Sequence, residues 1–152
     1  MEKIINKVNI LWGGLVTVLF GIFGHFWFLF AAFLILNAVD YITGWTKARL
    51  TQTENSNKGL RGIIKKVGYW IVIAISFFIA VSFKQMGGLL GINLSFMTLA
   101  GWFTLATFII NECRSILENL VAIGVEPMPP FLVKGLEVAA KLVKGAAEKE
   151  KP

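Results

Sequence analysis

The stretch FWFLFAAFLILNAVDYITGW, residues 26–45, decides the fold class of this chain. Eleven apolar residues run without a polar side chain before Asn37, and Asp40 carries the only charge in the stretch. As a helix these residues would extend about 30 Å, which is the thickness of the hydrocarbon core of a bilayer. The stretch therefore predicts a transmembrane helix that holds a carboxylate within it.

The composition of the whole chain agrees with a membrane protein. Hydrophobic residues make up 56% of its 152 residues, and the mean hydropathy is +0.70. Soluble domains average about 45–50% apolar residues. The apolar residues here form long blocks almost free of charge, which argues against a soluble helical bundle. We predict an all-α integral membrane protein.

Four apolar blocks are candidate transmembrane helices, at about residues 8–23, 26–45, 67–83 and 96–118. Only Gly24 and His25 separate the first two blocks. Together these two blocks would make a helix of about 57 Å, which is too long for one straight span. Since glycine accepts the left-handed backbone that ends a helix, we expect a helical hairpin near Gly24. The first block is short, so three spans remain an alternative to four.

Basic residues predict the orientation in the membrane. The polar loop 46–66 between the second and third blocks carries six basic residues and one acid, Glu54. With four spans and cytoplasmic N- and C-termini, fourteen of the fifteen basic residues are cytoplasmic and only Lys84 is outside. With three spans the count falls to twelve. The positive-inside rule therefore favours four spans with both termini in the cytoplasm.

A C-terminal amphipathic helix is predicted after the multi-span membrane domain of residues 1–124. The sequence VEPMPP (125–130) interrupts the chain, and Pro130 suits the first position of a helix. One face of that helix would carry Leu132, Leu136, Ala139 and Val143, and the other Lys134, Glu137, Lys141 and Lys144. Residues 125–152 would then form a cytoplasmic helix with a charged tail. It could lie on the inner leaflet or be a solvated helix.

Two polar stripes follow the helical period within the apolar blocks. The first is Asn37, Asp40, Gly44 and Lys47, and the second is Ala100, Thr104, Thr107, Asn111, then Arg114 or Ser115, then Glu118. Polar groups in a bilayer turn toward protein or water. We interpret these residues and Glu112 as candidates for a pore-lining or oligomerisation surface, with simple helix–helix attachment as the alternative. Arg114 is the expected partner of Asp40 or Glu112, and it could also pair with Glu118 at i, i+4.

Nothing in the sequence indicates an enzyme, a cofactor or a metal. Cys113 and His25 are each the only residue of their type, and no nucleophile stands with a base. The sequence GGLLG (87–91) follows no strand and reads as a flexible loop, not as a phosphate-binding turn. Because the basic residues flank apolar blocks, they indicate membrane orientation and not nucleic-acid binding. No small-molecule substrate is predicted, and the expected partner is the lipid bilayer.

Three motifs resemble those of the toxin-secretion/phage-lysis holin family, which includes the clostridial toxin-release holins. They are DYITGWTKARL (40–50), KGLRGIIKK (58–66) and NECRSILENLVAIGVEPMPPFL (111–132). The resemblance extends over about residues 8–137. The family pattern emphasises Asp40, Gly44, Lys58, Gly59, Arg61, Gly62, Lys65, Lys66, Asn111, Glu112, Ser115, Glu118, Asn119, Gly124 and Pro127.

The resemblance implies a small protein that accumulates in the bacterial cytoplasmic membrane, forms homo-oligomers and makes lesions. Through them an endolysin reaches the cell wall, or a large toxin leaves. Our hypothesis is that monomers pack their two polar stripes against each other and that oligomers turn them toward a lumen. One alternative is a small multi-span ion channel or transporter with Asp40 as an ion or proton site. Another is an inhibitory partner of a second holin.

Overall fold

The computed structural model describes residues 2–125 and 129–149, and within these residues it contains helices and no strands. The elements are α1 (Glu2–Phe23), η1 (Gly24–Phe26), α2 (Trp27–Leu50), α3 (Ser56–Leu90), η2 (Ser95–Met97), α4 (Thr98–Ile123) and α5 (Pro130–Lys149). Four helices among the described residues are long and apolar enough to cross a membrane. The all-α membrane fold predicted from the sequence is confirmed.

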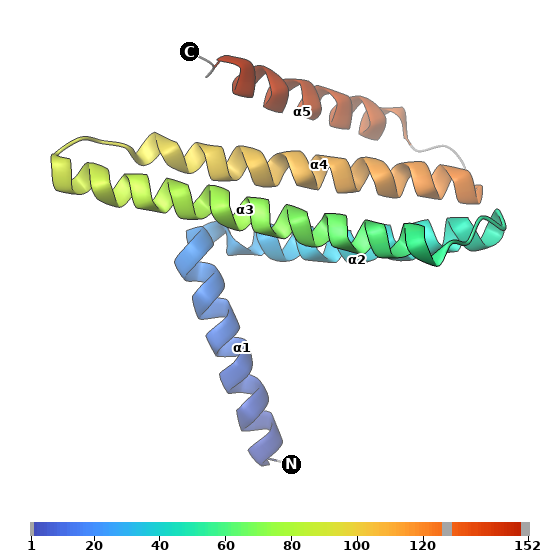
Figure 1. Cartoon of the computed structure of the whole chain (residues 1–152), viewed down its shortest axis with the longest axis horizontal. Coiled ribbons are helices and arrows are strands. Elements are labelled where there is room, and N and C mark those ends of the chain that lie inside the picture. The colour runs from blue at the N-terminus through green and yellow to red at the C-terminus, as the bar shows by residue number, and fades with distance from the viewer. Residues whose placement is uncertain (1, 126–128, 150–152) are drawn as a thin grey trace.

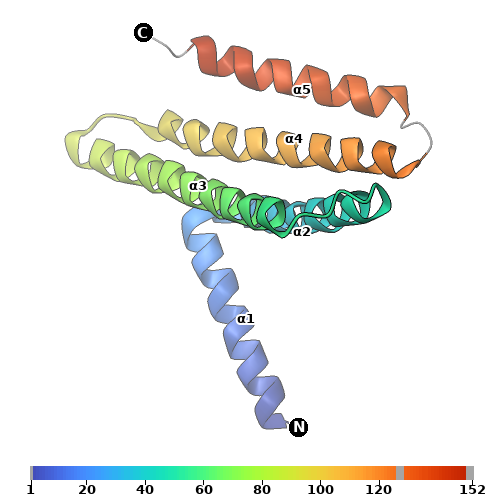
Figure 2. The same ribbon diagram turned by 45° about the vertical axis from the view of Figure 1, so that its right-hand side comes forward.

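Helices α2, α3 and α4 lie side by side as a bundle, with α3 antiparallel to the other two (Figure 1). In both Figure 1 and Figure 2, α1 diverges steeply from this bundle and α5 runs back along α4. Among the described elements, α5 contacts only α4. The three-helix bundle therefore brings together residues from α2, α3 and α4 that are far apart in the sequence.

The core of the bundle takes one large side chain from each of its helices. Phe33, Ile73 and Leu105 are essentially inaccessible to solvent. The ring of Phe77 lies over Gly101, where an added Cβ would come within 3.0 Å of the ring carbons. Because Gly101 has no side chain, α3 and α4 approach closely at this level.

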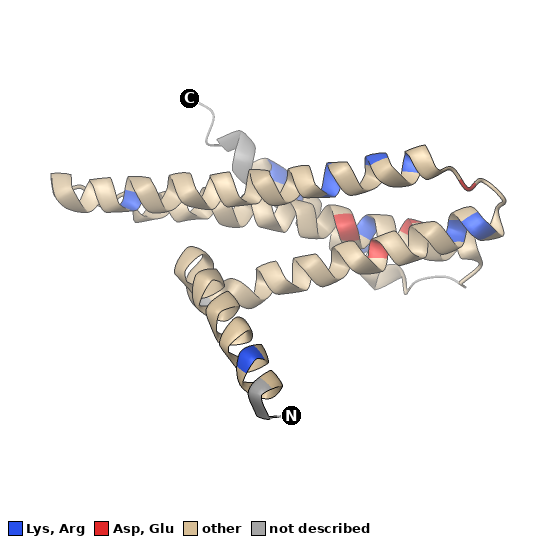
Figure 3. Ribbon diagram, turned by 60° about the horizontal axis from the view of Figure 1, so that its bottom comes forward, with Lys and Arg blue, Asp and Glu red and all other residues tan. Residues whose placement is uncertain are grey.

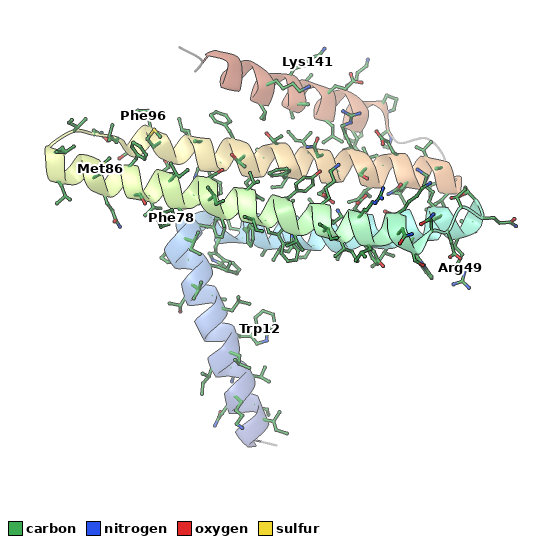
Figure 4. All side chains as sticks on the ribbon, viewed as in Figure 1. Trp12, Arg49, Phe78, Met86, Phe96 and Lys141 are labelled. Atoms are coloured by element: carbon green, nitrogen blue, oxygen red, sulfur yellow. The ribbon has the colours of Figure 1, made fainter. Side chains whose placement is uncertain are left out.

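The outward surfaces of α2 and α3 carry large apolar side chains, as contact with lipid requires. Phe78 on α3 is 73% exposed and Ile35 on α2 is 64% exposed. Figure 4 shows Phe78 pointing away from the bundle. Large hydrophobic residues on the outside would be a liability in water and are expected in a bilayer.

The break between α1 and α2 lies at Gly24, as predicted, where φ is +60°. Phe23 anchors the break by stacking on Phe30, with 4.5 Å between ring centroids. The prediction of a hairpin is wrong, because α1 diverges from α2 beyond this point and exposes Trp12 (Figure 4). Helix α1 also starts earlier than predicted, and its 22 residues extend about 33 Å, enough for a span. The side chain of His25 lies outside the described part of the chain.

The predicted loop 46–66 is mostly helical, because α2 continues to Leu50 and α3 begins at Ser56. Polar residues without proline are compatible with helix. Asn55 caps α3, since its Oδ1 accepts hydrogen bonds from the backbone N–H of Asn57 at 3.0 Å and of Lys58 at 3.2 Å. With 35 residues, α3 extends about 52 Å and exceeds the bilayer core.

The predicted flexible loop at residues 87–91 is instead the end of α3. Gly91, at φ +70°, terminates the helix, and the N–H of Ile92 donates to the carbonyl of Gly87 at 2.8 Å. Gly87 is buried against this turn, where an added Cβ would lie 2.5 Å from the carbonyl oxygen of Ile92. The glycines of this motif serve a tight helix end.

Helix α5 begins at Pro130, as predicted. Leu136, Ala139 and Val143 are half-buried, whereas Leu132 on the predicted apolar face and Lys141 are exposed (Figure 4). Whether α5 meets lipid or water stays a prediction, as does the division of the chain at residue 124. Pro127 and residues 150–152 lie outside the described residues.

Candidate functional site

One buried ion cluster connects the three helices of the bundle. The Nζ of Lys66 on α3 lies 2.9 Å from Oδ2 of Asp40 on α2, and it also donates to Oε2 of Glu112 on α4. The side chains of Lys66 and Asp40 are 15% and 14% exposed, and Glu112 is 4% exposed. A single ammonium group between two carboxylates therefore ties α2, α3 and α4 together.

Asn119 on α4 extends this cluster along α2. Its Nδ2 donates to Oδ1 of Asp40 at 3.1 Å and to Oγ1 of Thr43 at 3.4 Å, and its Oδ1 accepts from Nζ of Lys47 at 3.4 Å. Gly44 makes room for this amide, because a Cβ there would lie 3.4 Å from Asn119 Nδ2. We call Asp40, Lys66, Glu112 and Asn119 the inner cluster.

The ionised groups of the inner cluster are held by ion pairs and hydrogen bonds. Lys66 contacts both carboxylates, Asp40 and Glu112, and Asn119 donates to Asp40, whereas Lys47 reaches only Asn119. Charges held in a low-dielectric interior are tolerated when they are paired and hydrogen-bonded. The ionised groups of the cluster are therefore tolerated within an apolar bundle. Asp40, the carboxylate within the apolar stretch, belongs to a structural ion pair.

Asn37 lies about one helical turn from Asp40 and is 4% exposed. Its Nδ2 donates to the carbonyl of Phe33 on the same helix at 2.7 Å. Its Oδ1 accepts no hydrogen bond, and among the described residues it is the only buried side-chain N or O atom without a partner. Asn37, Asp40, Gly44 and Lys47 thus share the inward face of α2, as the sequence predicted.

The predicted pairing of Arg114 with Asp40 or Glu112 is wrong. Arg114 follows Glu112 by two residues, which places it about 200° further round the helix, on the outer side. It pairs instead with Glu118 at 3.4 Å, which confirms the alternative i, i+4 pair, and the two side chains are 62% and 65% exposed. The true partner, Lys66, directly precedes an apolar block, where a lysine can reach along its aliphatic chain to a carboxylate.

A second polar surface runs along α4 on the side away from the inner cluster. We call it the outer stripe, and it consists of Thr104, Thr107, Asn111, Arg114 and Glu118. Thr104 and Thr107 donate to the carbonyls of Ala100 and Phe103 on the same helix, both at 2.8 Å. Thr104 is half-exposed and the other four residues are exposed.

The two polar stripes predicted from the sequence therefore do not pack against each other within one chain. The stripe of α2 meets Glu112 and Asn119, which lie on a different face of α4 from the outer stripe. Glu112 belongs to the inner cluster, whereas the half-buried Ser115 borders it. The sequence placed polar residues correctly along α4, but their direction around the helix was set by packing.

A cavity of about 900 Å³ opens beside the inner cluster, between the end of α2 and the start of α3. Of the family-motif residues, Lys58, Gly59, Gly62 and Lys66 line this cavity. Arg61 and Lys65 are exposed and do not line it. Figure 3 shows that charged positions of the three-helix bundle gather toward this α2–α3 end.

The chemistry of these surfaces is pairing and solvation of charge. Within residues 2–125 and 129–149, no group of three or more His, Cys, Asp or Glu side chains is placed to hold a metal ion. Cys113 is a free, half-buried thiol on α4. Polar groups within apolar helices are the features that a membrane pathway or a subunit contact would use.

Known proteins resemble most of the chain. The family model of the bacteriophage holin family matches residues 17–141. An uncharacterised 14.9 kDa protein from the nagH 3′ region of Clostridium perfringens is 37% identical over 90% of this chain and 96% of its own length. An uncharacterised protein of Halalkalibacterium halodurans is 31% identical over 84% of this chain and 87% of its own length. No solved structure matches the chain.

Proposed function

The chain belongs to the bacteriophage holin family, and from this premise we propose that it accumulates in the bacterial cytoplasmic membrane, self-associates and opens lesions there. The cargo would be a folded protein, either an endolysin that attacks the cell wall or a large toxin that leaves the cell. Four helices of sufficient length and apolarity support a multi-pass arrangement. Holins act without a chemical step, so no catalytic residue is assigned.

Both termini and the α2–α3 turn are proposed to face the cytoplasm. This arrangement leaves only Lys84 of the fifteen basic residues outside the cell, as the positive-inside rule favours. Helix α1 is then the first span, for which its length is sufficient. Lys84 lies on α3 near the opposite end from Lys58 and Lys66, which supports this division.

The observation that carries the proposal is the outer stripe of α4. In a single chain embedded in lipid, Asn111, Arg114 and Glu118 would contact acyl chains or headgroups, because no other part of the described chain covers them. Insertion scales give about 2.5–3.5 kcal/mol for an arginine at the centre of a membrane helix. Arg114 lies beyond Glu112, the partner of Lys66, toward the proposed cytoplasmic end of α4, so its unfavourable free energy in lipid is smaller than this value. Association, with the stripe turned to neighbouring chains or to a water-filled lumen, removes this unfavourable contact.

The inner cluster has a different role in this proposal. Its charges are paired within one chain, so it has no need of a partner or of bulk water. We assign it to holding α2, α3 and α4 as one unit during assembly. The outer stripe, not Asp40, is then the surface that meets the lumen.

Inducible expression in bacteria tests the proposal, with culture turbidity and release of a cytosolic enzyme followed together. We expect an abrupt fall in turbidity together with enzyme release. A variant with Asn111→Leu, Arg114→Leu and Glu118→Leu should insert in the membrane but release little enzyme. The matched control carries Ile71→Leu, Ile75→Leu and Phe78→Leu on the lipid-facing side of α3 and should behave as wild type.

Three outcomes would overturn the proposal. Ion flux without enzyme release would indicate a channel or transporter. Abundant protein in the membrane with no effect alone, and delayed lysis when a second holin is present, would indicate an inhibitory partner. Normal release by the α4 variant would remove the outer stripe from the mechanism.

A further inference from the structure

We propose that the cavity between the end of α2 and the start of α3 binds the headgroup of an anionic phospholipid. The inference needs α2 and α3 to be embedded in a membrane, but it does not need the chain to form lesions. It assigns a ligand to the motif KGLRGIIKK, residues 58–66, in which the proposed function gives a role only to Lys66. Three properties of the cavity support this ligand: its charge, its volume and its depth in the membrane.

The cavity presents two cations that have no carboxylate partner. Lys47 and Lys58 both line it, and among the described residues neither is within 4.0 Å of an Asp or Glu oxygen. Lys66 also lines the cavity but is already paired with Asp40. Among the described residues, two acids line the cavity, Asp40 and Glu54. The unpaired ammonium groups therefore leave the cavity suited to an anion such as a phosphodiester.

Space for the headgroup comes from the glycines of the motif. Gly59 and Gly62 line the cavity, and a Cβ added to either would meet no atom within 4 Å. A volume of about 900 Å³ falls within the range of ligand sites in proteins. Thr53 and Ser56 add hydroxyl groups to the lining, and these can donate hydrogen bonds to phosphate oxygens. The walls thus combine open space with hydrogen-bond donors.

The depth of the cavity favours a lipid over a free anion. Its lining along α3 runs from Ser56 to Lys66, and the apolar run of α3 begins at the next residue, Val67. These eleven positions, seven of which line the cavity, extend about 16 Å from the apolar run, into the headgroup region and beyond. Trp45, half exposed at the cavity edge, is a residue type enriched at this interface. A headgroup can therefore enter sideways from the leaflet.

The test measures lipid retention by the purified full chain in detergent, using native mass spectrometry. Phosphatidylglycerol and phosphatidylcholine with identical acyl chains are the probes, and we expect selective retention of phosphatidylglycerol. Lys58→Gln should weaken this binding about fivefold, the effect of one lysine near an anionic surface. Arg61→Gln is the matched control, because it removes the same charge from the same helix outside the cavity, and it should stay within about twofold.

A second variant separates a built site from diffuse attraction. Gly62→Leu fills the cavity without changing charge, and it should abolish selective retention while the helix stays intact, since leucine favours helix more than glycine. Gly68→Leu, outside the cavity, is its control. Equal losses from Lys58→Gln and Arg61→Gln, or no loss from Gly62→Leu, would overturn the site. Full competition by millimolar inorganic phosphate would show a free-anion site and overturn the lipid assignment.

Discussion

The inner cluster and the outer stripe are both polar, and both depend on α4, yet they stand in opposite surroundings. Glu112 is 4% exposed and shares Lys66 with Asp40, whereas Arg114, two residues later, is 62% exposed and pairs only within its own helix. The inner cluster is complete within one chain. The outer stripe is complete only when something outside the chain covers or solvates it.

Polar residues within a membrane helix therefore have two separate uses. Turned inward, ionised groups connect helices that lack a hydrophobic drive to associate in lipid. Turned outward, the same kinds of residue make unfavourable contacts with acyl chains in the single chain, and these contacts favour assembly. A protein that inserts first and assembles later needs both, because the bundle has to stay intact while its outer contacts change.

The largest effect is expected from Lys66→Met, which leaves the carboxylates of Asp40 and Glu112 buried without their shared cation. Breaking a buried ion pair by removing one partner is destabilising by about 3–5 kcal/mol. Denaturant unfolding of the purified protein in detergent, followed by circular dichroism, measures this loss. Lys65→Met removes the same charge from an exposed neighbour whose Nζ lies 5.7 Å from the centroid of the Tyr69 ring, and it should change stability by less than about 1 kcal/mol. Equal effects of the two variants would show that the inner cluster does not hold the bundle.

A smaller loss is expected from Gly101→Ala, which tests the inward face of α4 without changing any charge. The added Cβ would lie 3.0 Å from the ring of Phe77, which is closer than ordinary van der Waals contact. Overpacking of this kind is destabilising by about 1–3 kcal/mol. Gly68→Ala meets no neighbour within 4 Å and should be neutral or stabilising. If both substitutions stabilise the protein in the same unfolding assay, α3 and α4 are not in close contact there.

Removing all the charges at the centre of the inner cluster should be milder than removing Lys66 alone. In the combined variant Asp40→Asn, Lys66→Met and Glu112→Met, the inner cluster keeps no charged group, and the amide at position 40 still accepts from Asn119. Apolar replacement of buried ion pairs is often close to neutral, so stability should return to within about 1 kcal/mol of wild type. Enzyme release in the expression assay should return with it. Restored stability without release would give the inner cluster a part in opening lesions.

The smallest effect on stability is expected from Arg114→Gln combined with Glu118→Gln on the outer stripe. Exposed ion pairs contribute about 0.2–1 kcal/mol, and both side chains are more than half exposed. The same variant should nevertheless alter the onset of lysis, because it changes the surface that we propose for assembly. A loss of stability as large as that of Lys66→Met would erase the distinction between the two regions.

The features that could be predicted from the sequence are those that depend on local order along the chain. Long apolar blocks predicted the four membrane helices, Gly24 predicted the break before α2, and Pro130 predicted the start of α5. These predictions succeed because the bilayer sets a helix length and because glycine and proline act on the backbone at their own positions. Three short motifs also sufficed to indicate the family.

Which polar residues lie inside the three-helix bundle is set by packing between the helices and could not be predicted from the sequence. The contacts of the inner cluster join residues 26 to 79 positions apart, and no periodicity within one helix predicts a partner at such a separation. The rotation of each helix about its axis is set where side chains fit, as at Gly101 beneath Phe77 and Gly44 beneath Asn119. Turning a helix about its axis by about 100°, the angle between successive residues, moves a side chain from the inside of the bundle to its outside. The divergence of α1 and the cavity beside α3 likewise arise from packing between helices, which a one-dimensional pattern does not record.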